Sequence, residues 1–231
     1  MLIVHYDINT DLLIPKTRSL SMKTRVFNLI IIDESGSMHC IKKETINNIN
    51  ETVQTIRASQ KKHEELKQYV SLVIFNDEVK TVYECVPAEE VKEFTADNYN
   101  PDCCTALYDA MGFSLNALRK NVVENDRVLV TIITDGYENA SREYEGKAIK
   151  VLVEELKEKG WSFVYVGANH DVEAVASSIS IKNTICFDAN SEGMKKMTTC
   201  LNAYSCCMFD DIAEETKSLK YNKDGKQDGT L

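Results

Sequence analysis

The sequence lacks the features that mark several common functional classes. It has no excess of basic residues, since the formal net charge of the 231-residue chain is -9. Nucleic acids and anionic membrane surfaces attract basic patches, so we expect neither as the main partner. No apolar run approaches the roughly 18 residues of a membrane-spanning helix. The first residues also lack the basic and long apolar segments of a signal peptide, and we therefore expect a cytoplasmic protein.

Familiar catalytic patterns are missing as well. The chain contains neither the Gly-x-x-x-x-Gly-Lys-Ser/Thr phosphate loop nor the Gly-x-Ser-x-Gly elbow of serine hydrolases. Position 35 is a serine, so the sequence after Asp33 does not offer the paired carboxylates of an Asp-x-Asp arrangement. These absences indicate that the protein is not an enzyme.

Eight cysteines are present, but their spacing is not that of a zinc site. The three in the last predicted helix lack a Cys-x2-Cys pair. Because the chain is large and carries no export signal, we expect reduced thiols, several of them in the core. The cysteines are Cys40, Cys85, Cys103, Cys104, Cys186, Cys200, Cys206 and Cys207.

What the chain does have is an ordinary globular composition, 43% hydrophobic and 27% charged, with alternating strand and helix patterns. Strands are predicted at 26–32, 69–75, 79–86, 128–133, 161–166 and 184–187. Helices are predicted at about 41–62, at 107–118, around 148–156, after Asp171, and from Met194 to Met208. This order predicts an α/β fold: a doubly wound, mostly parallel six-stranded sheet with helices on both faces. The turn at Asn76-Asp77 makes 79–86 the one antiparallel edge strand.

The pattern also suggests where the domain begins and ends. Residues 1–21 do not resemble the rest and are interpreted as an N-terminal extension. Residues 22–209 form the domain. From 210 to 231 the chain is polar, and we expect a flexible tail.

The loop that follows the first strand is the most informative segment. It reads Asp33-Glu34-Ser35-Gly36-Ser37 and comes directly after an apolar run. In open α/β sheets, ligands bind at the carboxyl ends of the strands. A carboxylate and two hydroxyls there are oxygen ligands of the kind that Mg2+ prefers. Helix capping is the alternative for these residues taken alone.

Two other segments supply further oxygen atoms. Thr105 precedes the 107–118 helix, and Asp135 follows the 128–133 strand in Thr-Asp-Gly. If the first and fourth strands are neighbours at the switch point, these side chains converge. The candidate metal ligands are Asp33, Ser35, Ser37, Thr105 and Asp135.

These residues resemble the metal-ion-dependent adhesion site of the von Willebrand factor A family. That site has the pattern Asp-x-Ser-x-Ser, a distant Thr, and an Asp followed by Gly. The resemblance covers about residues 24–208. It implies strand order 3-2-1-4-5-6 and one divalent ion, Mg2+ or Mn2+. It also implies that the serines, and in some states Thr105, bind the ion directly, while at least one aspartate acts through water. Many family members have glycines where this chain has Cys103-Cys104, which leaves direct ligation by Thr105 open.

The resemblance implies a metal-dependent protein-binding module whose partner supplies an Asp or Glu carboxylate to the ion. Neutral hydroxyl ligands would leave the ion strongly attractive to such a carboxylate. Two alternatives remain open. One is a Mg2+-dependent phosphoryl-transfer or hydrolase enzyme with Asp33 as the nucleophile. The other is a scaffold with a vestigial site.

Overall fold

The computed structural model describes residues 23–224 and has one six-stranded sheet in the order β3-β2-β1-β4-β5-β6. Only β3 is antiparallel to its neighbour, β2; the other pairs are parallel. The predicted fold class, strand order and edge hairpin are therefore confirmed. The strands are β1 (Thr24–Asp33), β2 (Leu66–Phe75), β3 (Val79–Pro87), β4 (Arg127–Thr134), β5 (Trp161–Gly167) and β6 (Asn183–Cys186).

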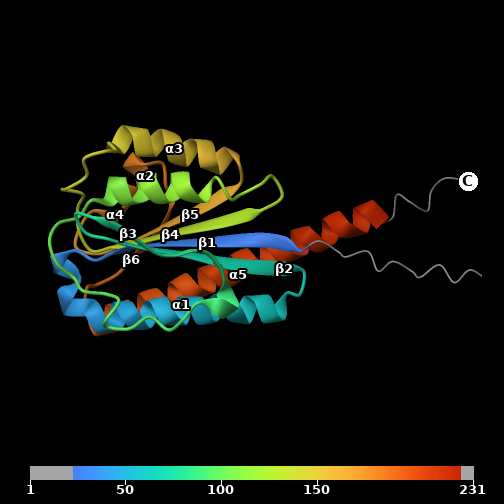
Figure 1. Ribbon diagram of the computed structural model, residues 1–231, viewed down its shortest axis with the longest axis horizontal. Coiled ribbons are helices and arrows are strands. Elements are labelled where there is room, and N and C mark those ends of the chain that lie inside the picture. Colours follow the sequence, from blue (N-terminus) through green and yellow to red (C-terminus); the bar gives the residue numbers. More distant parts are fainter. Residues whose placement is uncertain (1–22, 225–231) are drawn as a thin grey trace, which may run out of the picture.

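Helices cover both faces of this sheet, as Figure 1 shows. One face packs against α1 and α5, and the other packs against α2, α3 and the short α4. The helices are α1 (Lys42–Lys62), α2 (Leu107–Leu118), α3 (Gly146–Glu158), α4 (Val172–Ser178) and α5 (Ser191–Asp224). Two 3-10 turns, η1 (Gly36–Ile41) and η2 (Ala88–Glu90), complete the described elements. None of the helices in residues 23–224 is long and apolar enough to cross a membrane.

Strand β1 is central because its side chains are apolar on both faces. Val26, Ile30 and Ile32 belong to the core shared with α1 and α5. Phe27 and Leu29 belong to the core on the α2 side. A strand buried on both faces has an almost continuous apolar sequence. Its one buried amide, Asn28, donates to the Gln68 side chain at 2.9 Å. The first loop is therefore attached to a strand that is buried on both faces.

The expected C-terminal boundary differs from the structure. Helix α5 does not end near residue 209 but continues to Asp224. Phe209, Ile212, Ala213 and Thr216 are buried, and their spacing places them on one face of the helix. That apolar stripe continues the helix into the segment expected to be a tail. Residues 1–22 and 225–231, including the predicted extension, lie outside the described residues.

The cysteines also differ from expectation. All are free thiols; seven are exposed and Cys85 is partly buried. None belongs to the buried set that forms the two cores. Cys85 alone packs against a core, on the α2 side, so the prediction that several cysteines are core residues is wrong.

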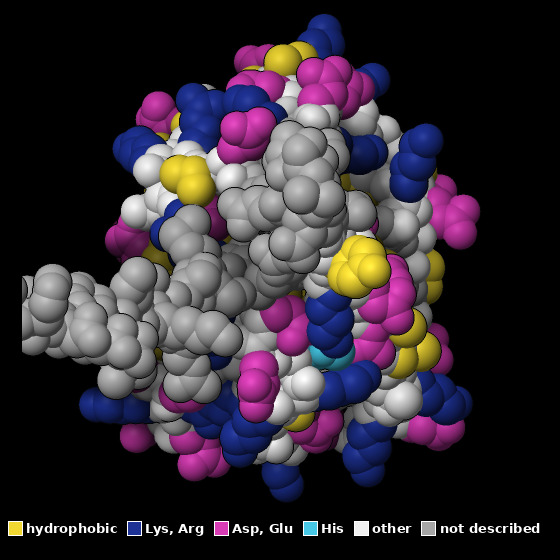
Figure 2. Space-filling view, turned by 90° about the vertical axis from the view of Figure 1, so that its right-hand side faces the viewer, with side chains coloured by type: hydrophobic (Ala, Val, Ile, Leu, Met, Phe, Trp, Pro, Cys, Tyr) yellow, Lys and Arg dark blue, Asp and Glu magenta, His cyan; other side chains and the backbone are white. Residues whose placement is uncertain are grey.

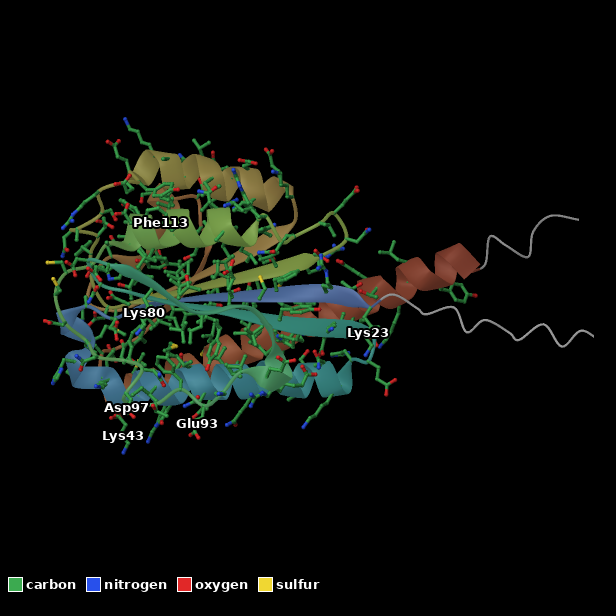
Figure 3. All side chains as sticks on the ribbon, viewed as in Figure 1. Lys23, Lys43, Lys80, Glu93, Asp97 and Phe113 are labelled. Atoms are coloured by element: carbon green, nitrogen blue, oxygen red, sulfur yellow. The ribbon has the colours of Figure 1, made fainter. Side chains whose placement is uncertain are left out.

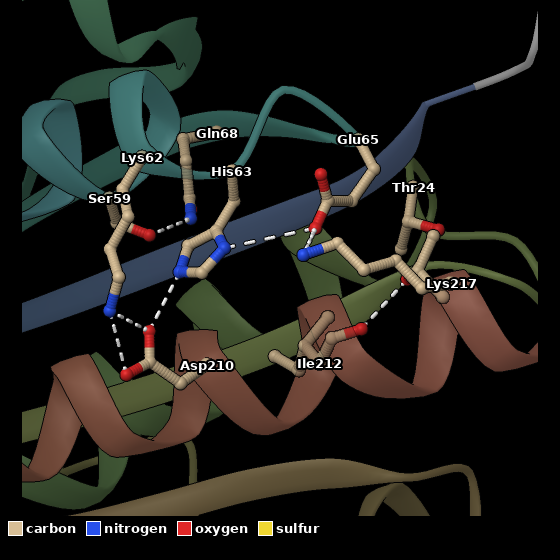
Figure 4. Close-up of polar contacts among 10 residues, drawn as sticks. Thr24, Ser59, Lys62, His63, Glu65, Gln68, Asp210, Ile212 and Lys217 are labelled. Atoms are coloured by element: carbon tan, nitrogen blue, oxygen red, sulfur yellow. Dashed lines mark hydrogen bonds and ion pairs between the residues drawn. The ribbon is translucent and has the colours of Figure 1, made fainter.

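The amino ends of β1 and β2 carry a network of paired charges. The Arg25 guanidinium contacts the buried Asp126 carboxylate at 2.6 Å. His63, at the end of α1, contacts Asp210 of α5 at 2.7 Å, as drawn in Figure 4. Figure 2 shows Lys or Arg and Asp or Glu side chains interspersed over the described part of this face. This edge is held together by pairs of opposite charge within the chain.

Candidate metal centre

The three segments singled out in the sequence meet at the carboxyl edge of the sheet. Strands β1 and β4 are adjacent and parallel along their length, so Asp33 and Asp135 leave the sheet on neighbouring strands. The loop before α2 reaches the same edge. Its Thr105 carbonyl accepts the Asn139 N–H, from the loop after β4, at 3.0 Å. The topology of the sheet is therefore what brings these distant residues together.

Asp33 is fully buried, and both of its carboxylate oxygens accept hydrogen bonds. Oδ1 accepts the Ser35 N–H at 2.7 Å, and Oδ2 accepts the Thr134 hydroxyl at 2.6 Å. Burial raises the pKa of Asp33 to about 6, although these hydrogen bonds oppose the rise. The hydrogen bonds fix the orientation of the carboxylate, and the burial makes its negative charge unfavourable without a cation.

Asp135 lies beside the two serines. Its Oδ1 accepts the Ser37 hydroxyl at 2.5 Å, and the Ser35 and Ser37 hydroxyl oxygens are 3.1 Å apart. Burial is also the main reason why the pKa of Asp135 is raised. Its second oxygen, Oδ2, is buried and has no hydrogen-bond partner within the described part of the chain. A buried carboxylate oxygen without a donor is unusual and indicates a missing ligand.

Thr105 points toward the same place. A Cβ atom built on Gly136 would lie 3.6 Å from the Thr105 hydroxyl oxygen and 3.8 Å from that of Ser37. Both hydroxyls therefore lie next to the position that Gly136 leaves open. The Thr105 N–H donates to the Asn139 side chain at 2.9 Å, which ties the threonine to the loop after β4. All five candidate ligands lie at this edge.

Several residues that hold the site in place were not identified from the sequence. Thr134 supports Asp33 directly, and the buried Tyr99 hydroxyl donates to the Asp33 carbonyl at 2.5 Å. Glu138 accepts the N–H groups of Ala140 and Ser141 at 2.9 and 2.7 Å, and so shapes its own loop. Thr134 directly precedes Asp135, so its place at a strand end was a usable signal. Tyr99 has no comparable signal, because its loop is irregular.

The loop before Thr105 is joined to the first loop by backbone contacts. The Gly36 N–H donates to the Cys103 carbonyl at 3.1 Å, and the Asp102 N–H donates to the Glu34 carbonyl at 2.9 Å. Cys103 has φ 65°, a left-handed conformation that favours glycine. Cys103 and Cys104 are both exposed. Neither of these two cysteines is therefore a buried packing residue.

The aromatic residues beside the site are held by local contacts. His170 is half-buried, and its Nδ1 lies 2.5 Å from the Ala168 carbonyl. Burial lowers the pKa of His170, which favours a neutral ring that donates from Nδ1. Tyr137, 55% exposed, lies against this ring at a centroid distance of 5.2 Å. His39, expected to be a surface residue, is exposed.

The donor set consists of two carboxylates and three hydroxyls. No group of three or more His, Cys, Asp or Glu side chains with metal-binding geometry occurs between residues 23 and 224. Any ion at this edge must therefore depend on the hydroxyls as well as on the aspartates. Oxygen ligands of this kind, together with the unpartnered Asp135 oxygen, fit a hard divalent cation such as Mg2+.

Comparisons with known proteins agree with the fold. The family model of the von Willebrand factor type A domain matches residues 29–199, well over half of the chain. No curated protein matches the sequence. Solved structures are similar at low identity, and at that level they show the fold alone.

Three of these structures illustrate the range. The PilB minor pilin from Streptococcus sanguinis aligns with TM-score 0.55 and 14% identity, covering 80% of this chain and 62% of the pilin. Proximal thread matrix protein 1 from the mussel byssus has TM-score 0.58 and 14% identity, covering 80% and 47%. BatB from Bacteroides thetaiotaomicron has TM-score 0.51 and 12% identity, covering 79% and 99%. The chain therefore spans less than two thirds of the pilin and of the mussel protein.

Proposed function

Because the chain belongs to the von Willebrand factor type A family, a family of protein-interaction modules, we propose that it binds a protein partner through a divalent cation. The cation is Mg2+ or Mn2+, held at a metal-ion-dependent adhesion site. The ligands are Asp33, Ser35, Ser37, Thr105 and Asp135. The partner supplies an Asp or Glu carboxylate.

The buried Asp135 oxygen without a donor carries this proposal. Two carboxylates lie close together at this edge, both with raised pKa because of burial, and neither forms an ion pair with a described Lys, Arg or His. A divalent cation would compensate both charges and occupy the free oxygen. Without one, the buried negative charge is unfavourable.

The hydrogen bonds of Asp33 support an indirect role for it in binding the ion. Both of its oxygens already accept protein donors, so it is suited to act through a water molecule. The hydroxyls of Ser35, Ser37 and Thr105 contribute no charge, so a bound ion would keep enough positive charge to attract a partner carboxylate. The same hydrogen bonds support a binding role rather than catalysis, because a buried and fully hydrogen-bonded Asp33 is poorly placed as a nucleophile.

A thermal-unfolding experiment tests the metal site. With saturating Mg2+ or Mn2+, the melting temperature of the wild type is expected to rise above its value in EDTA, because the ion binds only the folded state. Asp33→Ala and Asp135→Asn should lose this rise. Asp97→Asn is a charge-matched control: Asp97 is exposed, and Figure 3 shows it at the outer side of the α1 layer, away from the sheet. A wild type that does not respond to either ion would contradict the proposal.

A second experiment tests the partner. The protein is immobilised and titrated with free glutamate, with a Glu-containing peptide and with the matched Gln peptide, in Mg2+ and in EDTA. We expect metal-dependent retention of the Glu peptide only. Equal retention of the Gln peptide would show that the ion does not recognise a carboxylate. Turnover of a generic phosphoester that disappears in Asp33→Ala would favour the enzyme instead.

A further inference from the structure

Adjacent thiols lie in the loop that positions Thr105. Cys103 and Cys104 are both exposed and are neighbours in the chain. The next residue is Thr105. The two sulfur atoms are therefore accessible to small reagents, and each lies close to the other.

The backbone of the same pair is part of the metal loop. The Cys103 carbonyl accepts the N–H of Gly36 at 3.1 Å, and Gly36 stands between Ser35 and Ser37. The loops also touch closely, since a Cβ on Gly36 would lie 3.5 Å from the Cys103 oxygen. A change in the backbone at Cys103 would therefore reach both serines and Thr105.

A second adjacent pair in the chain provides a natural comparison. Cys206 and Cys207 are also exposed, but they lie within α5. Consecutive side chains of a helix point in different directions, and a disulfide between them would break the helix. The loop pair has no helical hydrogen bonds to lose, and Cys103 already has φ 65°.

We propose that Cys103 and Cys104 form a redox modification site at which low-molecular-weight disulfides, of the glutathione type, weaken metal binding. One thiolate attacks the reagent disulfide, its S–S bond breaks, and one reagent thiolate leaves. The second cysteine then attacks the mixed disulfide and displaces the other reagent thiolate. The leaving thiolates take up the two cysteine protons. The cysteine pair is oxidised, and one reagent disulfide is reduced to two thiols.

The product is reversible because it is strained. Adjacent Cα atoms are about 3.8 Å apart, less than the roughly 4.4–6.8 Å usual for a disulfide. Closing the ring must distort the backbone at Cys103, and a strained disulfide is easily reduced. The distortion moves the Cys103 carbonyl and Thr105 away from the arrangement that faces the serines. The effect on metal binding rests on the proposed function, but formation of the disulfide does not.

Mass spectrometry after treatment with oxidised glutathione tests whether Cys103 and Cys104 form the disulfide. In the wild type, we expect the peptide with Cys103 and Cys104 to lose two hydrogen atoms. The peptide with Cys206 and Cys207 should gain only glutathione adducts. Cys103→Ser and Cys104→Ser should each stop at a mixed disulfide. Ring closure at the helical pair, or none at the loop pair, would overturn the proposal.

Metal titration of the reduced and the oxidised protein tests the second half. Oxidation should weaken the apparent affinity for Mg2+ by about tenfold, within the range seen when the supports of metal ligands are changed. Dithiothreitol should restore it. The double variant Cys103→Ser/Cys104→Ser should bind Mg2+ equally before and after treatment, whereas Cys206→Ser/Cys207→Ser should respond like the wild type. Unchanged affinity in the closed form would overturn the regulatory role. If the reduced wild type does not bind Mg2+, both the proposed function and the regulatory role fail. The mass measurement still decides independently whether the disulfide forms.

Discussion

Carboxylates are buried at both ends of the sheet, but different groups donate hydrogen bonds to them at the two ends. At the amino edge, the buried Asp126 accepts two hydrogen bonds from Arg25, at 2.9 and 2.6 Å. At the carboxyl edge, Asp33 and Asp135 accept only from hydroxyl and backbone N–H groups. The buried carboxylate at the amino edge is therefore paired with an arginine, whereas Asp33 and Asp135 form no ion pair within residues 23–224.

The amino edge also uses its charges to attach α5. His63 and Lys62 of the α1 end both contact Asp210, and Lys217 contacts Glu65 at 3.0 Å. These contacts join segments more than a hundred residues apart. Paired charges of this kind connect distant segments of the chain, whereas the two unpaired carboxylates belong to the proposed metal site.

The largest expected effect is a pH dependence at the carboxyl edge. The pKa of Asp33 in the folded protein, about 6, lies above its ordinary value of 3.8. The unfolded chain therefore loses its proton first, and folding stability without metal should fall as the pH rises from about 4 to 6. A pKa difference of about 2 corresponds to about 3 kcal/mol in the free energy of unfolding. Urea unfolding in EDTA, carried out across this pH range on the wild type and on Asp33→Asn, measures the loss as the difference between the two proteins.

Above pH 6, saturating Mg2+ should restore most of the folding stability that is lost, because the ion favours the ionised Asp33 carboxylate. If the two proteins show parallel pH profiles in EDTA, burial does not raise the pKa of Asp33 and the contrast between the edges fails.

Asp126→Ala should have the next largest effect, a loss of about 2–3 kcal/mol in the free energy of unfolding. The change removes an acceptor for Arg25 and for the Val123 N–H, which donates to Asp126 at 2.7 Å. Guanidinium unfolding of the variant with and without Mg2+ measures the effect. The loss should be the same in both conditions, since none of the five candidate ligands lies at this edge. A loss that depends on Mg2+ would mean that the edges are coupled.

Thr134→Val should destabilise the protein by about 1–2 kcal/mol and weaken Mg2+ binding by about tenfold. The valine keeps the shape but removes the donor to Asp33. Thermal unfolding and metal titration measure the two effects together. Thr131→Val, in the same buried strand but away from the five candidate ligands, serves as the control and should leave metal binding unchanged.

Lys62→Ala should have the smallest effect. The lysine is largely exposed, and its contact with Asp210 at 2.7 Å is screened by water and salt. The melting temperature should fall only slightly, and less so at high salt. A large fall at all salt concentrations would show that this exposed pair, rather than the buried contacts of α5, attaches the helix.

Much of the fold was predictable because it follows from local patterns. The apolar run at 26–32 and the alternation of strands and helices predicted the sheet and its central strand. The five candidate ligands were found because each stands at a strand end or just before a helix. Their convergence depends on β1 and β4 being neighbours, which the resemblance supplied and periodicity alone did not. Whether they hold a metal stays a prediction.

The failures arose where side-chain burial depends on distant partners. The polar composition after residue 209 suggested a tail, but Phe209 and Ile212 pack against the α1 side of the sheet and extend α5. The cysteines suggested core residues, but seven are exposed and Cys85 is only partly buried against the core on the α2 side. In both cases the composition of a short segment was used to predict whether its side chains are buried. Burial depends instead on which distant segments pack against it.

The sequence by itself determined the order of the strands and helices up to about residue 209, and which oxygen-bearing residues follow the strands, because hydrophobic periodicity and turn chemistry act over short stretches of chain. Only the tertiary structure decided that Thr134 and Tyr99 hold Asp33, that one oxygen of Asp135 has no hydrogen-bond partner within residues 23–224, and that Cys103 and Cys104 face solvent. Those properties depend on which segments become neighbours when the sheet assembles, and contacts between residues a hundred positions apart leave no local signal.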